Sequence, residues 1–313
     1  MKQGSAHSHA ASGGSSVIVF GSAGVELRTS ALQRARKRLQ ALGFDVQIDA
    51  SVKLRHQRFA GSDEQRLATL HRVADSGASI ALACRGGYGM TRLLDAIDWK
   101  RIARSVARGT RWVGYSDMTT LQMGLLAHAG ASSWAGPMAC DDFGRADDAG
   151  GVDDVTRDCF VEAMSGQLHA LGYRTEAGHD GLHTKGVLWG GNLAMLCSLL
   201  GTPHFPRVKG GILFVEEVNE HPYRIERCLL QLHQAGVLGA QKALLFGAAT
   251  EYTPSPLDRG YTLKSAIAHL RGVSRTPILT GLPFGHVRTK MSFPIGCKVE
   301  LAVQGRDVFF AWR

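Results

Sequence analysis

The chain has 313 residues, of which 44% are hydrophobic and 20% charged, and its formal net charge is +9. This composition is typical of a globular protein and excludes a chain that is disordered throughout. No run of about 18 apolar residues is present, which excludes a membrane-spanning helix, and the length indicates two domains or one large one.

The 36 basic residues are spread along the chain and no recognition motif accompanies them. We expect the longest cluster, residues 34–38, to be a solvated helix face, and we expect no nucleic-acid partner. The six cysteines are scattered without a C-x-x-C pair, which favours reduced thiols in a cytosolic protein. Residues 1–16 are small and polar and lack the apolar stretch of a secretory signal, so we expect a disordered tail.

Strands and helices alternate from Ser16 onward. Short apolar runs predict buried strands at 17–20, 80–84 and 112–115, and polar–apolar alternation predicts a strand at 44–48. Helical spacing of apolar residues predicts helices capped by Ser30 and by Ser62, and a third helix after Ser116. Repeated β-then-α units predict an α/β fold, with a parallel sheet covered by helices on both faces.

The pattern changes after Pro137. The segment 146–184 is rich in Asp and Gly, and we interpret it as a linker between an N-terminal domain, 17–145, and a C-terminal domain, 185–313. In the second domain, the sequence predicts strands at 187–189, 212–217 and 243–248, helices at 193–200 and 225–232, and a closing hairpin of 299–303 with 308–311.

The junction Gly114-Tyr-Ser-Asp-Met118 is the most informative part of the sequence. A buried strand meets a helix at Ser116, an arrangement that exposes a hydroxyl beside the first helical N–H groups. The pattern G-x-S-x-G is not met, because Met118 replaces the second glycine. The alternative is that Ser116 only caps the helix that follows.

A serine nucleophile needs a base, and the base needs an orienting acid. His286 follows a Pro-Phe-Gly loop, and Glu216 and Glu217 end an apolar strand. A carboxylate in that position is expected to be partly buried and able to hold an imidazolium. The alternatives are an ordinary loop histidine and a structural ion pair of these acids with Arg224 or Arg227.

The glycine-rich turn 85–89, Arg-Gly-Gly-Tyr-Gly, is the candidate oxyanion partner. Glycines let backbone N–H groups approach a tetrahedral oxygen closely. Neither phosphate-binding glycine motif is present here. A plain turn between a strand and a helix is the alternative.

Seven motifs in this order resemble the LD-carboxypeptidases, a family of serine peptidases to which the microcin-immunity peptidases are related. The similarity extends from about Val17 to the C-terminus. The motifs are Phe59-Ala-Gly-Ser-Asp-Glu-Gln-Arg66, Arg85-Gly-Gly-Tyr-Gly89, Gly114-Tyr-Ser-Asp117, Trp189-Gly-Gly-Asn-Leu193, Leu200-Gly-Thr-Pro203, Leu213-Phe-Val-Glu-Glu217 with Pro222-Tyr-Arg-Ile-Glu-Arg227, and Gly281-Leu-Pro-Phe-Gly-His286.

The resemblance implies a catalytic triad of Ser116, Glu216 and His286. It also implies an oxyanion hole formed by the backbone N–H groups of Gly87 and Asp117. Glu216 aligns with the glutamate of the family's Leu-Phe-Leu-Glu-Asp stretch. The residue after it, a glutamate here, replaces the family's usual aspartate.

The resemblance further implies an N-terminal flavodoxin-like or amidotransferase-like domain and a smaller, swivelling β/α C-terminal domain. The implied protein is a cytoplasmic homodimer without cofactor or metal that removes the terminal D-alanine from muropeptide tetrapeptides. A microcin-immunity-type peptidase that acts on peptidyl-nucleotides or acyl-adenylates is the alternative. The candidate substrate-binding residues are Arg85, Tyr88, Trp189 and Arg288.

Overall fold

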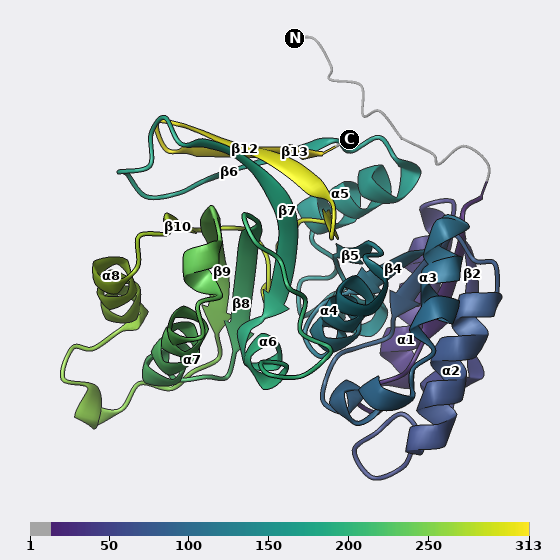
Figure 1. The fold of residues 1–313 in the computed structure, drawn as a ribbon. Helices are drawn as coiled ribbons and strands as arrows, with labels where there is room; N and C mark the ends of the chain where they lie inside the picture. Colours follow the sequence, from purple (N-terminus) through teal and green to yellow (C-terminus); the bar gives the residue numbers. More distant parts are fainter. Residues whose placement is uncertain (1–13, 313) are drawn as a thin grey trace.

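The computed structural model describes residues 14–312 (Figure 1). Residues 1–13 of the expected tail, 1–16, therefore lie outside the described residues. No helix within 14–312 combines the length and the apolar character needed to cross a membrane.

The first half of the chain alternates strands with helices, as predicted. The strands are Ser16–Phe20 (β1), Asp45–Ile48 (β2), Ile80–Ala83 (β3), Arg111–Gly114 (β4) and Ser133–Ala135 (β5). The helices are Thr29–Ala41 (α1), Asp63–Asp75 (α2), Trp99–Ala107 (α3), Met118–Ala129 (α4) and Asp154–Ser165 (α5).

These strands form a parallel sheet in the order β5-β4-β3-β1-β2. In β1, Val17 packs with the apolar sides of α1 and α5, while Ile18 faces the opposite core with α2, α3 and α4. Helices therefore cover both faces, as a flavodoxin-like sheet requires. The strand order reverses between β1 and β3, which is where such folds bind ligands at the carboxyl ends of the strands.

The second half forms a seven-stranded sheet in the order β10-β9-β8-β7-β12-β13-β6. Its strands are Ala170–Arg174 (β6), His183–Asn192 (β7), Ile212–Val218 (β8), Ala243–Thr250 (β9), Ile278–Thr280 (β10), Lys298–Gln304 (β12) and Asp307–Trp312 (β13). Its helices are Leu193–Ser198 (α6), Pro222–Gln234 (α7) and Leu263–Val273 (α8). The long strand β7 pairs parallel with β8 at one end and antiparallel with β12 at the other, so it joins the two parts of the sheet.

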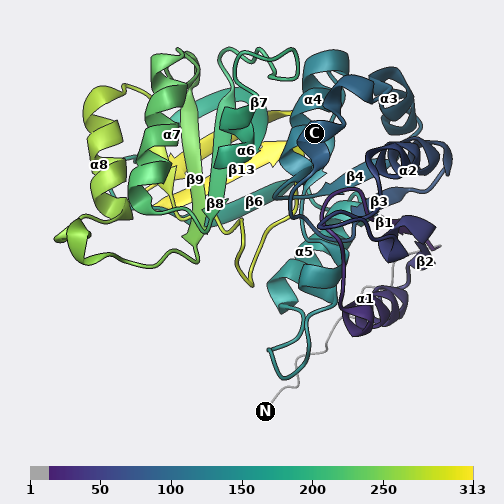
Figure 2. The ribbon, with the colours of Figure 1, turned by 90° about the horizontal axis from the view of Figure 1, so that it is seen from below.

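The two halves are interlocked. Strand Phe293–Ile295 (β11) comes from the second half but pairs antiparallel with β5, at the edge of the first sheet. Helices α4 and α6 face each other between the sheets (Figures 1 and 2), and there the Asn192 backbone N–H donates to Thr119 Oγ1 at 2.9 Å. The first sheet and the second are thereby placed against one another at the carboxyl ends of β4 and β7.

The predicted elements agree with the structure in type and order, with differences at some boundaries. The capping box at Ser62 and Gln65 and the closing hairpin β12–β13 are confirmed. The predicted cap at Ser30 is wrong, because α1 begins at Thr29 and Arg28 occupies the capping position. The segment 146–184 contains α5, which packs in the first core, and β6, which pairs with β13; its role as a linker stays a prediction.

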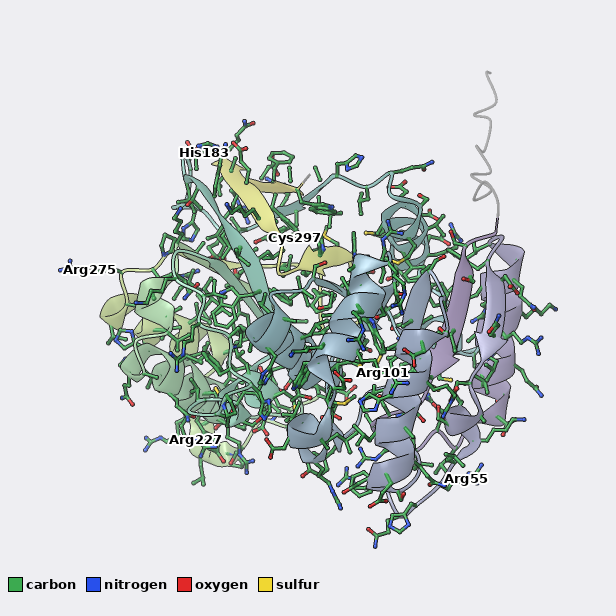
Figure 3. All side chains as sticks on the ribbon, turned by 45° about the vertical axis from the view of Figure 1, so that its right-hand side comes forward. Arg55, Arg101, His183, Arg227, Arg275 and Cys297 are labelled. Carbon is green, nitrogen blue, oxygen red and sulfur yellow. The ribbon has the colours of Figure 1, made fainter. Side chains whose placement is uncertain are left out.

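The basic side chains do not follow a single track in the view of Figure 3. Of the labelled arginines, Arg55, Arg227 and Arg275 lie at separate places near the outline, and Arg101 lies near the middle of the view. The positive net charge is thus carried by dispersed residues in this part of the molecular surface.

Candidate active site

Ser116 lies on a sharp turn between β4 and α4. Its φ of +62° is in the left-handed region, which costs a serine conformational energy and is typical of functional positions. A backbone hydrogen bond ties this turn to the start of α4, since the N–H of Thr119 donates to the Ser116 carbonyl oxygen at 2.9 Å. The result is the strained strand-to-helix elbow that presents a nucleophilic hydroxyl.

The structure does not support the alternative that Ser116 is a helix cap. The capping position of α4 is Asp117, and its side chain makes no capping hydrogen bond. Instead, Asp117 Oδ2 accepts the N–H of Met90 at 2.9 Å, and burial raises the pKa of this carboxyl to about 6. Within residues 14–312, no hydrogen bond involves Ser116 Oγ, so the hydroxyl is not occupied by a structural role.

Two backbone N–H groups close to this hydroxyl lack acceptors. Among the described residues, neither the N–H of Gly87 nor that of Asp117 donates a hydrogen bond. The turn 85–89 approaches Ser116 closely, because a Cβ on Gly86 would come within 2.7 Å of Ser116 Oγ. Gly87 has a φ of +106°, a conformation that glycine adopts without strain. Free donors beside a serine are the arrangement expected for an oxyanion hole.

Glu216 and His286 form a hydrogen-bonded pair from two elements of the second half. His286 Nδ1 lies 2.8 Å from Glu216 Oε2. An ionised carboxylate only accepts, so Nδ1 carries the proton and Nε2 is left free. Glu216 is completely buried in β8, at a point where the register with β9 shifts, and its Oε1 has no partner.

The pKa of His286 reflects two opposing effects. Burial disfavours the charged imidazolium, but the hydrogen bond to Glu216 and the charge of that carboxylate favour it. The second effect prevails, and the pKa of His286 is raised above its usual value. A histidine held in this way is a stronger base than a free one.

Glu217, the other candidate acid, points into a different environment. Its carboxylate accepts from Asn192 Nδ2 at 2.8 Å and from the backbone N–H groups of Ala194 and Val218. Burial raises its pKa to about 7, although these hydrogen bonds favour the ionised form. The structure therefore pairs Glu216, and not Glu217, with the histidine.

His286 contacts Tyr115, the residue before Ser116. The rings of His286 and Tyr115 meet edge to face with centroids 4.9 Å apart, and Tyr115 directly precedes Ser116. No hydrogen bond joins Ser116 Oγ to the imidazole in the described part of the chain. Such bonds often tighten only when substrate is bound.

A cavity of about 550 Å³ opens beside this constellation. Tyr115, His286 and Arg85 line it together with nine residues that were not among the candidate site residues. Those residues are Arg28, Arg34, Asp141, Gly144, Arg145, Ala146, Ala149, Glu251 and Val287. Only folding brings these nine residues to one cavity, because they come from four separate segments.

The other predicted substrate contacts are not all in this cavity. Arg85 lines it, whereas the guanidinium of Arg288 lies against Gly150 and donates to its carbonyl oxygen at 2.7 Å. The prediction for Trp189 is wrong, because its side chain is fully buried and its indole N–H donates to Gln241 Oε1 at 3.0 Å. Its ring packs in the core against Phe205, with centroids 5.7 Å apart.

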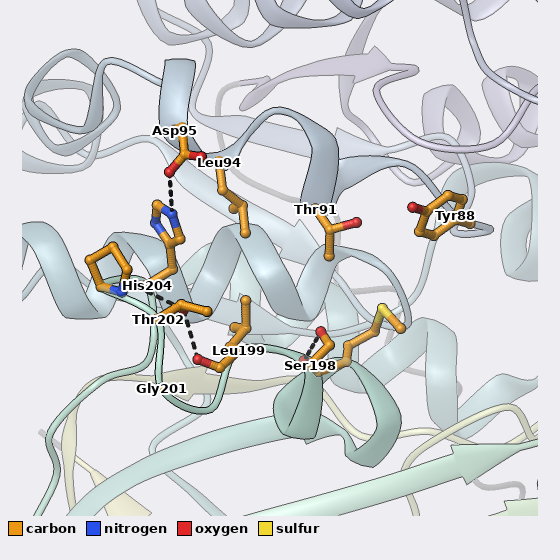
Figure 4. Close-up of a pocket in the computed structure, with 11 residues that line it drawn as sticks. Tyr88, Thr91, Leu94, Asp95, Ser198, Leu199, Gly201, Thr202 and His204 are labelled. Atoms are coloured by element: carbon orange, nitrogen blue, oxygen red, sulfur yellow. Dashed lines mark hydrogen bonds and ion pairs between the residues drawn. The ribbon is translucent and has the colours of Figure 1, made fainter.

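Tyr88 lies in a second cavity of about 580 Å³, between the first half and the loop after α6 (Figure 4). At its opposite end, His204 Nε2 lies 3.0 Å from Asp95 Oδ1. His204 Nδ1 is also hydrogen-bonded to His128 of α4, at 2.9 Å. Side chains from both halves thus meet at this cavity.

One group of three potential metal ligands occurs among residues 14–312. One ligand atom each from Glu26, Cys84 and Cys140 lies within 4.8 Å of the others, and all three residues are buried. These three side chains already have partners within the protein, since Glu26 pairs with Arg28 at 2.8 Å and the two thiols contact each other at 3.3 Å. All six cysteines are free thiols, as expected.

Family models match most of the chain. Residues 17–136 match the LD-carboxypeptidase N-terminal domain, and residues 185–301 match the LD-carboxypeptidase C-terminal domain. A probable murein peptide carboxypeptidase from Bacillus subtilis is 30% identical over 264 residues, which cover 84% of this chain and 81% of that protein.

Solved structures agree with this match. The muramoyltetrapeptide carboxypeptidase from Oxalobacter formigenes is 38% identical, has a TM-score of 0.85, and is aligned over 94% of this chain and 97% of its own. The microcin C7 self-immunity protein MccF has a TM-score of 0.83 over 96% of both chains but is only 19% identical, so that similarity shows the fold alone.

Proposed function

Because the chain belongs to the LD-carboxypeptidase family, we propose that it is a serine carboxypeptidase acting on muropeptide tetrapeptides in peptidoglycan recycling. The bond cleaved joins an L-centre, of diaminopimelate or lysine, to the terminal D-alanine. The names of its relatives support this substrate. The observation that carries the proposal is the Glu216–His286 pair, set against Tyr115 beside the strained Ser116.

In the proposed reaction, His286 Nε2 takes the proton of Ser116 Oγ as this oxygen attacks the carbonyl carbon. Glu216 keeps the imidazole in the required tautomer and stabilises the imidazolium that forms. The N–H groups of Gly87 and Asp117 hold the oxyanion, which is worth roughly 3–4 kcal/mol per donor in other hydrolases. The imidazolium then protonates the leaving amine, D-alanine departs, and water releases the acyl group by the same steps in reverse.

The reaction depends on how the two halves meet. Ser116 and the oxyanion donors belong to the first half of the molecule, whereas Glu216 and His286 belong to the second. A displacement of about 1 Å between them is expected to cost on the order of a hundredfold in rate. The interlocking of β11 with β5 supports a fixed placement of these groups.

The alternative, a peptidase for acyl-adenylates, has less support. Trp189, the candidate substrate-binding residue whose indole could stack on a nucleobase, is enclosed in the core. Three relatives, at 29%, 30% and 38% identity, are named as murein or muramoyltetrapeptide carboxypeptidases, while MccF shares the fold at 19% identity.

Replacement of the nucleophile tests the proposal. The wild-type protein is expected to convert a purified muropeptide tetrapeptide to the tripeptide, seen by mass spectrometry as the loss of one alanine. Ser116→Ala is expected to abolish turnover, with a melting temperature within a few degrees of wild type, because the hydroxyl makes no structural hydrogen bond. Turnover by this variant would refute the nucleophile assignment. Consumption of an aminoacyl-sulfamoyl adenosine in place of the tetrapeptide would support the alternative.

We also propose, from the family resemblance, that the protein acts in the cytoplasm as a homodimer. Six free thiols are consistent with a reducing compartment. Sedimentation equilibrium is expected to give twice the mass of the chain, and a monomer at micromolar concentration would contradict the dimer.

A further inference from the structure

The cavity beside His286 has more positive than negative side chains. Arginines contribute four of its lining residues, and only Asp141 and Glu251 contribute carboxylates. An excess of guanidinium groups next to a catalytic histidine indicates an anionic part of the ligand. The question is which arginine is available to bind it.

The charge of Arg28 is already paired within the protein. Its guanidinium contacts Glu26 at 2.8 Å and Asp141 at 2.6 Å. Arg145 lies 3.9 Å from Asp142, a carboxylate that also pairs with Lys290. These two arginines therefore have acidic partners before any ligand arrives.

Arg85 has no carboxylate partner among residues 14–312. Its Nη1 donates to the Val25 carbonyl oxygen at 3.0 Å, and its Nε is buried without an acceptor. That Nε is enclosed by the protein, so a ligand in the cavity would be bound through the Nη groups, of which Nη2 makes no hydrogen bond among the described residues. Arg34 is the closest equivalent, but its Nε is occupied by the carbonyl oxygen of Gly144 at 2.9 Å.

The position of Arg85 matches the position of the leaving residue. It precedes Gly86 and Gly87 directly, and Gly87 is a proposed oxyanion donor. In a carboxyl-terminal residue, only the amide nitrogen and the Cα separate the scissile carbonyl carbon from the free carboxylate. The carboxylate thus lies within about one residue length, 3.8 Å between Cα atoms, of the oxyanion. Arg85 lies two residues before Gly87 in the chain, and its side chain is long enough to reach that carboxylate.

We propose that Arg85 binds the free α-carboxylate of the residue that is removed and thereby restricts cleavage to the carboxyl end of the peptide. The inference rests on the proposed function and adds its specificity-determining residue. The planar guanidinium offers two parallel N–H donors to a carboxylate, a geometry that neither a carboxamide nor an internal peptide group matches. Arg288, the other candidate, is turned away onto Gly150.

Two substrates and two variants of the same pocket test this assignment. The substrates are the tetrapeptide with a free carboxyl terminus and the same peptide with a terminal carboxamide. Wild type is expected to favour the acid by about 100-fold in kcat/KM. In Arg85→Met, this preference is expected to fall below about fivefold, mainly through a higher KM for the acid.

Arg34→Met is the matched control, since it removes one positive charge from the same cavity. It is expected to lower kcat/KM for the acid by a few fold through the pocket's overall charge, and to keep at least half of the preference. If Arg85→Met is unstable by circular dichroism, Arg85→Lys keeps the charge without the paired donors and is expected to give an intermediate preference.

The outcomes separate this inference from the proposed function. Equal cleavage of acid and amide by wild type, or an unchanged preference in Arg85→Met, overturns the carboxylate assignment while leaving the peptidase in place. Loss of the preference in Arg288→Met but not in Arg85→Met assigns the role to Arg288 and equally overturns it. If wild type cleaves neither peptide, the proposed function fails and this inference fails with it.

Discussion

The loop between β10 and β11 contributes the basic residue of two acid–base pairs, and these pairs lie in different environments. His286 pairs with Glu216 inside the second half of the molecule, and Lys290 pairs with Asp142 across the two halves. The His286 side chain is 19% exposed, whereas that of Lys290 is 0% exposed and that of Asp142 is 1% exposed. The first pair therefore has access to solvent and substrate, and the second pair does not.

The two pairs also differ in how completely they are hydrogen-bonded. Lys290 Nζ donates to the Val287 carbonyl oxygen at 2.6 Å as well as to Asp142, and Asp142 Oδ2 accepts the N–H of Met138 at 2.8 Å. Within the described part of the chain, Glu216 Oε1 has no partner and His286 Nε2 makes no hydrogen bond. A fully bonded pair fixes one arrangement of the halves, while an incompletely bonded pair is available for proton transfer.

Tyr115 connects these two pairs. Lys290 Nζ lies 4.9 Å from the centroid of its ring, and the ring of His286 meets it at the same distance. The loop that docks the second half onto the first therefore also holds the histidine against Tyr115, the residue before Ser116. This arrangement predicts that damage to the first pair changes the rate, whereas damage to the second changes stability.

The largest expected effect is on catalysis. His286→Gln is expected to lower kcat by roughly 10⁴-fold or more, because the base that removes the serine proton is lost. Its unfolding midpoint in urea is expected to stay close to wild type, since the ring is only partly enclosed. Steady-state kinetics on the tetrapeptide and a urea titration measure the two quantities. A rate within tenfold of wild type would exclude His286 as the base.

The two neighbouring glutamates, Glu216 and Glu217, test which acid orients the histidine. Glu216→Gln is expected to lower kcat by about 10⁴-fold, because the imidazole loses the partner that sets its tautomer. Glu217→Gln is the matched control in the same strand. It perturbs the hydrogen bonds to Asn192 and Ala194 and is expected to lower stability while retaining most of the rate. The reverse ranking of the two rates would move the orienting role to Glu217.

The second pair is expected to act on stability. Lys290→Met removes the cation from a buried carboxylate and is expected to destabilise the protein by about 3–5 kcal/mol. The double variant Lys290→Met with Asp142→Asn is expected to recover part of that loss, because it leaves no buried charge. Denaturant unfolding of the two variants measures the difference. Equal stability of Lys290→Met and wild type would show that this pair does not hold the halves together.

Local patterns in the sequence predicted the fold well. Apolar runs and caps placed β1, β3, β4, α2 and β8 close to their observed bounds, because these elements depend on residues near in the chain. Strand β11 was not predicted, since it is three residues long and pairs with β5 about 160 residues earlier in the chain.

The site was only partly predictable for a related reason. The residues Ser116 and His286 stood at recognisable turns, but alternation along β8 could not decide whether Glu216 or Glu217 faces the histidine; the family resemblance made that choice. Neither the Lys290–Asp142 pair, 148 residues apart, nor the strained Glu251 at φ +58° carries a local signal. Trp189, predicted at the end of a strand and proposed as a substrate contact, instead packs in the core.

The smallest expected effect is on the pH dependence of kcat/KM, and it involves only the Glu216–His286 pair. The pKa of His286 is raised because Glu216 favours the imidazolium more than burial opposes it. The base must be neutral to accept the serine proton, so kcat/KM is expected to fall as the pH decreases, with the midpoint of the acid limb above 6.5. In Glu216→Gln, the burial remains without the carboxylate, and the midpoint is expected to move to lower pH. Proton NMR of the His286 ring in the Ser116→Ala background follows the same titration without turnover. A midpoint that Glu216→Gln leaves unchanged would contradict the coupling of this glutamate to the histidine.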